Sequence, residues 1–165
     1  MLDDHPRDPG PRRLTIYTIG LGGRQLAEIE GILDRHGIST LVDVRTESGP
    51  GEPDTSTLAE QCRVIGLGYL WMGDRLGGRP RHPSLLSADG LPDWDAVARS
   101  PMFRAAIGEL MTLAETGHVA VLCSEESPEV CHRSFLIGTH LEDTGVEVLH
   151  IRGDALFRHQ RGLGL

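Results

Sequence analysis

Lysine and asparagine are both absent from this chain of 165 residues, and its 16 strongly basic side chains are all arginines. Without lysine there is no Walker-type phosphate loop and no Schiff-base or pyridoxal-phosphate chemistry. Without asparagine there is no acceptor for N-linked glycosylation. Whatever anion the protein binds must therefore be held by guanidinium groups and backbone amides.

Basic residues are also outnumbered, because 24 acidic side chains give a formal net charge of -8. This charge disfavours nucleic acid and an anionic membrane as partners, although it allows a local arginine pocket. No apolar run approaches the roughly 18 residues of a membrane span, and the polar, proline-rich N-terminal segment is unlike a signal peptide.

Three cysteines, an odd number, favour a reducing compartment over a disulfide framework. We expect a cytoplasmic protein without a membrane partner, and homo-oligomerisation stays open.

Short apolar runs alternate with helical patterns along residues 14–157, which we expect to form a single α/β domain. The strands are expected at 14–20, 39–45, 68–72, 118–123 and 146–151. This pattern predicts a Rossmann-like three-layer sandwich, with an open, mostly parallel five-stranded sheet and helices on both faces. Residues 1–13 are expected to be a disordered leader and residues 158–165 a flexible tail.

A segment rich in glycine, arginine and proline, at 73–90, is expected to be a loop. Its length is unusual for a compact domain and favours a binding role. Arg75, Arg79, Arg81 and His82 suit an anionic small molecule, a nucleotide or a nucleic-acid backbone. In the preceding strand, Tyr69 and Trp71 could stack a base, although strand alternation places at least one of them in the core.

Polar residues follow four of the predicted strands, and open parallel sheets bind ligands beyond the carboxyl ends of their strands. The expected substrate-binding residues are Gly20, Gly22, Arg24, Arg45, Arg75, Gly77, Gly78, Arg79 and Arg133. Gly20 and Gly22 begin a dinucleotide fingerprint, but Gln25 stands where its third glycine belongs. The sequence therefore favours a tight turn over a nicotinamide site, although amides at a helix start can hold a phosphate or carboxylate.

The segment CSEESPEVCHRS, residues 123–134, carries the most specific chemical signal. Cys131 is expected in the first turns of a helix, where the helix dipole and Arg133 favour a thiolate and His132 could assist nucleophilic catalysis. The expected catalytic residues are Cys131, His132, Glu125 and Asp43. Two features oppose this interpretation: the surrounding glutamates raise a thiol pKa, and the phosphatase spacing C-x5-R follows neither cysteine.

A metal site is the alternative use of the same segment. Cys123, Cys131 and His132 could bind iron or zinc, but the C-x7-C spacing matches no structural zinc pattern. For Cys123 taken alone, an inert buried residue at a strand end is the favoured interpretation, and Cys62 is expected in the core. The sequence requires no cofactor.

Several motifs occur together in one order: TIG at 18–20, LVDVR at 41–45, GYLWM at 68–72, RLGGR at 75–79, SPMF at 100–103, LCSEE at 122–126 and CHRS at 131–134. This order resembles the family catalogued as domain of unknown function 488. The resemblance implies a Rossmann-like domain of bacterial and archaeal cytoplasm without an established general activity. Its signature positions here are Gly20, Asp43, Arg45, Leu76, Gly77, Gly78, Cys123, Glu125, Cys131, His132 and Arg133.

The chain departs from that family pattern in two places. Members typically read TIGHS-x-R, whereas Leu21 and Gly22 replace the His-Ser pair here. Residues 46–57 are acidic, whereas relatives tend to be arginine-rich there. The acidic replacement favours a small ligand over a polyanion.

These observations lead to one main hypothesis and two alternatives. The main hypothesis is a cysteine-based transferase or hydrolase that acts on an anionic or nucleotide-like small molecule at the carboxyl ends of the strands. Arg45, Arg79 and Arg133 would clamp the anion. The alternatives are a non-catalytic module that binds a nucleotide or nucleic acid, and an iron or zinc protein.

Overall fold

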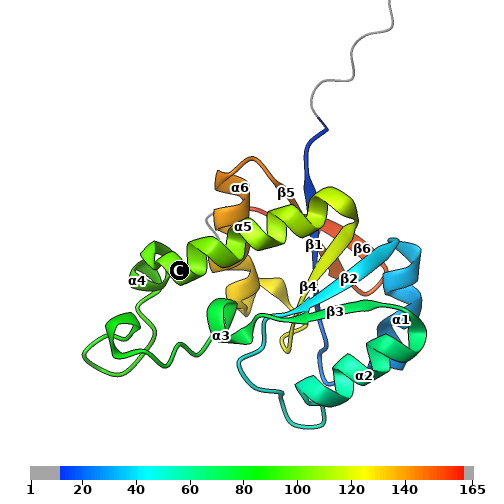
Figure 1. The fold of residues 1–165 in the computed structure, drawn as a ribbon, viewed down its shortest axis with the longest axis horizontal. Helices are drawn as coiled ribbons and strands as arrows, with labels where there is room; N and C mark the ends of the chain where they lie inside the picture. The colour runs from blue at the N-terminus through cyan, green and yellow to red at the C-terminus, as the bar shows by residue number, and fades with distance from the viewer. Residues whose placement is uncertain (1–11, 162–165) are drawn as a thin grey trace, which may run out of the picture.

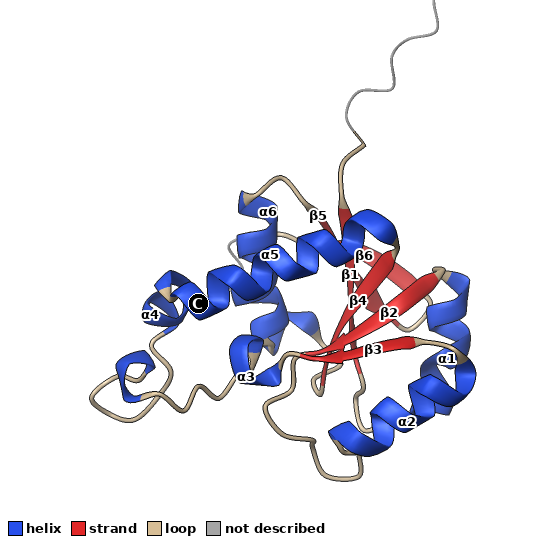
Figure 2. Ribbon diagram, viewed as in Figure 1, coloured by secondary structure: helices blue, strands red, loops and turns tan. Residues whose placement is uncertain are grey.

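The computed structural model describes residues 12–161, which form one sheet with helices on both faces (Figures 1 and 2). The strands are β1 (Thr15–Gly20), β2 (Ile38–Asp43), β3 (Gly68–Trp71), β4 (His118–Cys123), β5 (Glu147–Arg152) and β6 (Ala155–Arg158). Their order is β3-β2-β4-β1-β5-β6, and every pairing is parallel except that of β5 with β6. The predicted α/β class and mostly parallel sheet are confirmed.

The helices divide between the two faces of the sheet. They are α1 (Leu26–Arg35), α2 (Thr55–Ile65), α3 (Gly73–Leu76), α4 (Trp94–Arg99), α5 (Pro101–Thr116) and α6 (Thr139–Asp143), with a π-helical segment at Arg133–Gly138 and 3-10 turns at Pro83–Leu85 and Pro128–Val130. α1 and α2 pack against one face, and α5, α6 and the π-helical segment pack against the other (Figure 2). Helical turns at α3 and Pro83–Leu85 therefore interrupt the segment predicted as a loop.

The prediction of five strands was wrong, because the described residues contain a sixth. β6 is an exposed edge strand, so it has no buried face to produce an alternating pattern. The sequence feature that could have indicated β6 is Gly153-Asp154, which forms the two-residue turn between β5 and β6. Gly153 adopts a φ of +56° in this turn. β6 includes Arg158, and the following His159 is buried, although both fall within the predicted tail. The first 11 residues of the predicted leader and residues 162–165 lie outside the described part.

The chain contains two Ser-Pro pairs that favour a helix start, Ser100-Pro101 and Ser127-Pro128, and they differ in outcome. At α5 the Ser100 hydroxyl accepts a hydrogen bond from the Phe103 amide at 3.2 Å, and Pro101 occupies the first turn. Pro128 instead opens a single 3-10 turn, and the chain is extended at Cys131 (φ -115°, ψ 139°). The prediction that Cys131 lies within the first turns of a helix was therefore wrong. Cys131 precedes the π-helical segment, and its carbonyl accepts the Ser134 amide at 2.9 Å.

The carboxyl ends of β1 and β4 are joined beyond the strands themselves. The Leu21 amide donates to the Cys123 carbonyl and the Gly22 amide to the Ser124 carbonyl, both at 2.8 Å. A Cβ at Gly20 would collide with the Glu125 carbonyl, so glycine permits this close approach. No helix within residues 12–161 has the length and apolar character to cross a membrane.

Candidate functional site

Asp43 and Arg45, at the end of β2, form a buried ion pair. The Arg45 Nε and Nη2 atoms donate to the two Asp43 carboxylate oxygens at 2.9 and 2.8 Å, and Nη1 donates to the Pro53 carbonyl at 2.9 Å. Burial disfavours the charge of Arg45, but the bonds to Asp43 and the nearby Glu52 outweigh it and raise its pKa. Because every guanidinium nitrogen bonds to the protein and the side chain is only 1% exposed, Arg45 is not available to an external anion.

Arg133 lies fully buried inside the loop that follows β4. Its Nη1 donates to the Glu125 carbonyl and to Cys123 Sγ (3.1 Å), Nη2 to the Glu126 carbonyl (2.7 Å), and Nε to Thr18 Oγ1 (3.2 Å). A loop that binds phosphate turns its amides inward. This loop instead turns carbonyls inward, toward a cation of the chain itself, so Arg133 does not form part of an open anion clamp.

In the glycine-rich turn after β1, hydrogen bonds within the protein occupy the polar groups that a phosphate could otherwise contact. Arg24 donates to the carbonyls of Gly20 and Leu21, both at 2.8 Å. The Gln25 backbone N–H donates a hydrogen bond to the Glu28 carboxylate at 2.7 Å, as part of a capping box at the start of α1. Gly22, with a φ of +59°, serves the turn itself. This geometry supports the tight-turn interpretation over a phosphate-binding fingerprint.

Cys131 and Cys123 are neighbouring buried thiols within one apolar cluster. Cys131 Sγ lies 3.7 Å from His132 Nδ1 and accepts the Arg133 backbone N–H at 3.5 Å. Hydrogen bonding from the Cys123 thiol lowers the pKa of Cys131, and His132 and Arg133 lower it further against the opposing effect of burial. The same bond, together with burial, raises the pKa of Cys123. Cys131 is therefore the thiol of the pair that ionises first.

His132 connects this cysteine pair to the segment that follows β3. Its Nε2 lies 2.9 Å from the Leu76 carbonyl oxygen, and its ring packs against Gly78, where a Cβ would come within 3.0 Å of Nδ1. A side chain at Gly77 would collide with Thr46 Oγ1 and the Gly73 carbonyl. Gly77 and Gly78 are therefore explained by close packing, and the segment 76–78 lies between His132 and the cavity described next.

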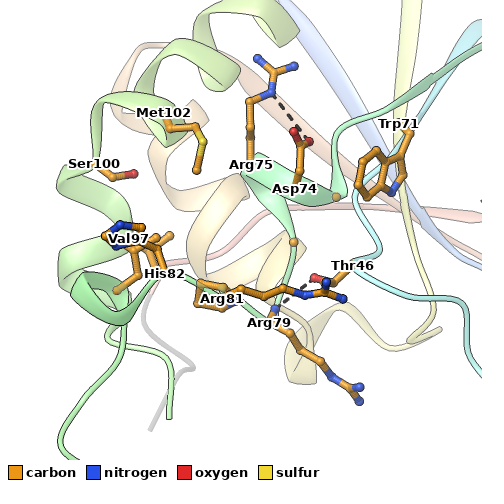
Figure 3. A pocket seen from close by; sticks show the side chains of 14 residues that line it. Thr46, Trp71, Asp74, Arg75, Arg79, Arg81, His82, Val97, Ser100 and Met102 are labelled. Carbon is orange, nitrogen blue, oxygen red and sulfur yellow. Dashed lines mark hydrogen bonds and ion pairs between the residues drawn. The ribbon is translucent and has the colours of Figure 1, made fainter. Parts of the chain in front are cut away.

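A cavity of about 270 Å³ opens beside this segment (Figure 3). α3, the residues after it, and the region around α4 and the start of α5 provide its walls. Its apolar side chains are Trp71, Pro80, Leu85, Val97 and Met102, and its charged or titratable side chains are Asp74, Arg75, Arg79, Arg81 and His82. The Trp71 ring is held in place by a bond from its Nε1 to the Arg45 carbonyl at 2.9 Å. The cavity thus combines apolar walls with an excess of cationic groups.

The three arginines of the cavity differ in how tightly the protein holds them. Arg75 forms two bonds to the Glu109 carboxylate, at 2.6 and 2.9 Å. Arg79 and Arg81 are exposed, with side chains 79% and 78% accessible, and both pair with Glu47 (3.7 and 2.9 Å). Arg79 and Arg81 are therefore the arginines that an external anion can reach most readily.

The structure divides the residues predicted for one site into separate groups. Cys131, His132 and Arg133 lie together with Cys123 in the interior, whereas Arg75, Gly77 and Arg79 line the cavity. Asp43 lies in the core, and the Glu125 side chain is exposed while its carbonyl holds Arg133. No group of three or more His, Cys, Asp or Glu side chains within residues 12–161 is placed to hold a metal ion.

Sequence reasoning missed several residues that line the cavity: Thr46, Leu85, Val97, Ser100 and Met102. Leu85 lies within the segment 73–90, and Ser100 and Met102 lie within the SPMF motif at 100–103, but nothing local to these residues predicted that they would line one cavity. The signals that pointed to this region were the length of the segment 73–90, its arginines, and Trp71 in the preceding strand.

Comparisons with curated proteins and with solved structures found no match. A model of the family described as "Domain of unknown function DUF488" matches residues 25–139, which is more than half of the chain. The matched range contains the Asp43–Arg45 pair, the cavity and the segment from Cys123 to Arg133. The chain therefore belongs to the DUF488 family.

Proposed function

We propose that the protein binds a small anionic molecule with a planar or apolar part, such as a nucleotide, in the cavity beside α3. The observation that carries this proposal is the pair of exposed guanidinium groups, Arg79 and Arg81, beside the apolar walls formed by Trp71 and Met102. Guanidinium groups bind phosphate or carboxylate in a planar, bidentate way, and an apolar wall accepts a ring.

The charge of the cavity supports an anionic ligand. On a chain of net charge -8, the cavity lining carries three arginines and His82 against one acidic side chain, Asp74. Such a concentration of one sign raises the local concentration of the opposite ion. Glu47 lies across from Arg79 and Arg81, but exposed ion pairs are weak, so a phosphate can displace its carboxylate.

Calorimetric titration tests the proposal with adenosine 5′-monophosphate, adenosine and inorganic pyrophosphate as probes. We expect the monophosphate to bind at least about tenfold more tightly than adenosine, since the phosphate supplies charge-assisted bonds. The Arg79→Ala/Arg81→Ala double variant should lose this preference. Arg35→Ala is the matched control, because Arg35 is an exposed arginine paired with Asp154 and is not part of the cavity lining. Equal affinity for monophosphate and adenosine, or full phosphate affinity in the double variant, would contradict the proposal.

The salt dependence of binding separates a small ligand from nucleic acid. A single-stranded oligonucleotide contacts several cations at once, so its affinity falls steeply as the salt concentration rises. We expect the monophosphate to compete for the cavity and the oligonucleotide to bind no more tightly than the monophosphate. A much tighter and strongly salt-dependent oligonucleotide complex would favour the alternative of a nucleic-acid-binding module.

A second candidate function is a cysteine-based transferase or hydrolase. It is favoured by the lowered pKa of Cys131 and by the contact from His132 to Leu76, beside the cavity lining. In this version the cavity binds the substrate, and segment 76–78 moves to expose Cys131. p-Nitrophenyl acetate and p-nitrophenyl phosphate serve as probes. Wild type and Cys62→Ser should release a burst of nitrophenolate, whereas Cys131→Ser should release none. A full burst from Cys131→Ser would exclude this role.

We also propose that the protein works in the cytoplasm. The support is its cysteine chemistry, since Cys62, Cys123 and Cys131 are all free thiols and a reducing compartment preserves them.

A further inference from the structure

Arg133 carries a positive charge in a fully buried position, and no carboxylate in the described part of the chain contacts its guanidinium. Its acceptors are the Thr18 hydroxyl, the carbonyls of Glu125 and Glu126, and the sulfur of Cys123. A buried cation that is solvated only by neutral groups is unfavourable unless an anion lies nearby. The neighbourhood of Arg133 therefore requires a source of negative charge.

The two neighbouring cysteines can supply that charge. Arg133 Nη1 donates to Cys123 Sγ at 3.1 Å, and the Arg133 backbone N–H donates to Cys131 Sγ at 3.5 Å. Cys123 and Cys131 lie in the same buried cluster and both contact Arg133, so the pair can hold one proton and one negative charge. The lowered pKa of Cys131 agrees with this arrangement. With a two-electron oxidant, a thiolate and a neighbouring thiol can form a disulfide.

We propose that Cys131 and Cys123 form a two-cysteine redox site, in which a small hydroperoxide oxidises Cys131 and Cys123 then converts the product to a disulfide. The site goes beyond the proposed function and does not depend on a ligand in the cavity. Arg133 would stabilise the charged sulfur, and His132 would lie beside it.

The reaction balances with hydrogen peroxide as the oxidant. The Cys131 thiolate attacks one peroxide oxygen, so an S–O bond forms, the O–O bond breaks, and the hydroxide that leaves takes up a proton to become water. The Cys123 thiol then attacks the sulfur of the Cys131 sulfenic acid. An S–S bond forms, the S–O bond breaks, and a second water leaves. Two sulfurs are oxidised and one peroxide is reduced.

Burial limits the site to small oxidants and gives an internal control. Cys131 and Cys123 are 3% and 2% exposed, whereas Cys62 is 0% exposed. Burial raises the pKa of the Cys62 thiol to about 11, and the charge of Asp43 adds to the effect. Cys62 is thus a buried cysteine that, within residues 12–161, has no hydrogen bond to another thiol or to an arginine. It should react at least about tenfold more slowly than Cys131 at pH 7.

The test uses the reduced, full-length wild-type protein, treated with hydrogen peroxide, denatured, and alkylated with N-ethylmaleimide. Intact mass should show three alkylated cysteines before treatment and one after it, with the loss of two hydrogens. Cleavage at glutamate separates the two cysteines, because Glu125, Glu126 and Glu129 lie between them. The two peptides should remain joined until dithiothreitol is added, and Cys62 should carry the alkyl group.

Variants separate the roles of the two sulfurs. Cys62→Ser should form the same disulfide as wild type. Cys123→Ser should stop at a sulfenic acid that reacts with dimedone, whereas Cys131→Ser should lose peroxide reactivity by at least about tenfold. In wild type, equal oxidation of Cys62 and Cys131, a disulfide that includes Cys62, or three intact thiols after treatment would each overturn the proposal. The wild-type measurement stands even where a variant fails to fold.

Discussion

Arg45 donates through Nε and Nη2 to both carboxylate oxygens of Asp43, two residues earlier in the chain, and their side chains are 1% and 0% exposed. The Tyr69 hydroxyl also donates to Asp43, at 2.7 Å, from the neighbouring strand β3. The charges of Asp43 and Arg45 are thus both balanced by hydrogen-bond partners in the interior of the protein. The Asp-Val-Arg motif at 43–45 consequently fixes the end of β2 and the segment that leads to Pro53.

Asp43→Asn should therefore reduce stability severely. The substitution leaves the charge of Arg45 buried with only the more distant Glu52 carboxylate, at 3.4 Å, so we expect a loss of about 3–5 kcal/mol in the free energy of unfolding. Urea denaturation measures the change. Glu60→Gln is the matched control, since Glu60 pairs with Arg63 at the exposed surface of α2 and its loss should change stability little. Similar effects of the two substitutions would contradict this assignment.

Gly20→Ala should destabilise the junction of β1 and β4. A Cβ at this position meets the backbone of Glu125 and Glu126, which cannot give way without disturbing the loop around Arg133. We expect a cost of about 1–3 kcal/mol or more from overpacking, measured by thermal or urea unfolding. Gly31→Ala provides the contrast, because a Cβ there meets nothing within 4 Å and alanine favours helix α1 by up to about 1 kcal/mol.

Lowering the pH should weaken the fold through His150. Burial lowers the pKa of His150 to about 4, and the charges of His159 and Arg133 add to the effect. Its Nδ1 lies 2.7 Å from Thr18 Oγ1, and its Nε2 lies 3.0 Å from His159 Nδ1. Below pH 6.5 the unfolded chain takes up a proton that native His150 does not accept. The free energy of unfolding should therefore fall by about 3 kcal/mol between pH 6.5 and pH 4 because of this residue.

His150→Gln isolates that contribution, because glutamine keeps hydrogen-bonding capacity without titrating. Urea denaturation at several pH values measures the free energy of unfolding of both proteins. As the pH falls from 6.5 to 4, the wild type should lose more of this free energy than His150→Gln does. Parallel curves from pH 7 to pH 4 would show that His150 does not cause the loss.

Glu47→Gln should strengthen binding of an anion in the cavity. Glu47 pairs with both Arg79 and Arg81, so an incoming phosphate must compete with its carboxylate. Removing that charge should raise the affinity for adenosine 5′-monophosphate about two- to fivefold, opposite in sign to Arg79→Ala/Arg81→Ala. Calorimetric titration provides the measurement, and Glu60→Gln should leave the affinity unchanged. A weaker complex with Glu47→Gln would place the anion away from these two arginines.

Local signals were sufficient for much of the architecture. Continuous apolar runs marked the buried strands, and Ser100-Pro101 marked the start of α5 because a cap depends on adjacent residues. The edge strand β6 lacked such a signal, since it has only four residues and all of them are exposed. The extended backbone at Cys131 was missed for another reason. It depends on Arg133, whose bonds to the Glu125 and Glu126 carbonyls shape the preceding loop.

The sequence by itself determined the α/β class and the mostly parallel sheet. It also determined that an anion must be held by guanidinium groups or backbone amides, because the chain contains no lysine. It could not determine which arginines remain available to a ligand. The tertiary structure decided that, by surrounding Arg45 with Asp43 and Pro53, and Arg133 with carbonyl oxygens, while leaving Arg79 and Arg81 exposed beside the cavity. The physical reason is that a guanidinium bonds to whichever acceptors the fold brings within about 3 Å, and those acceptors come from segments distant in sequence.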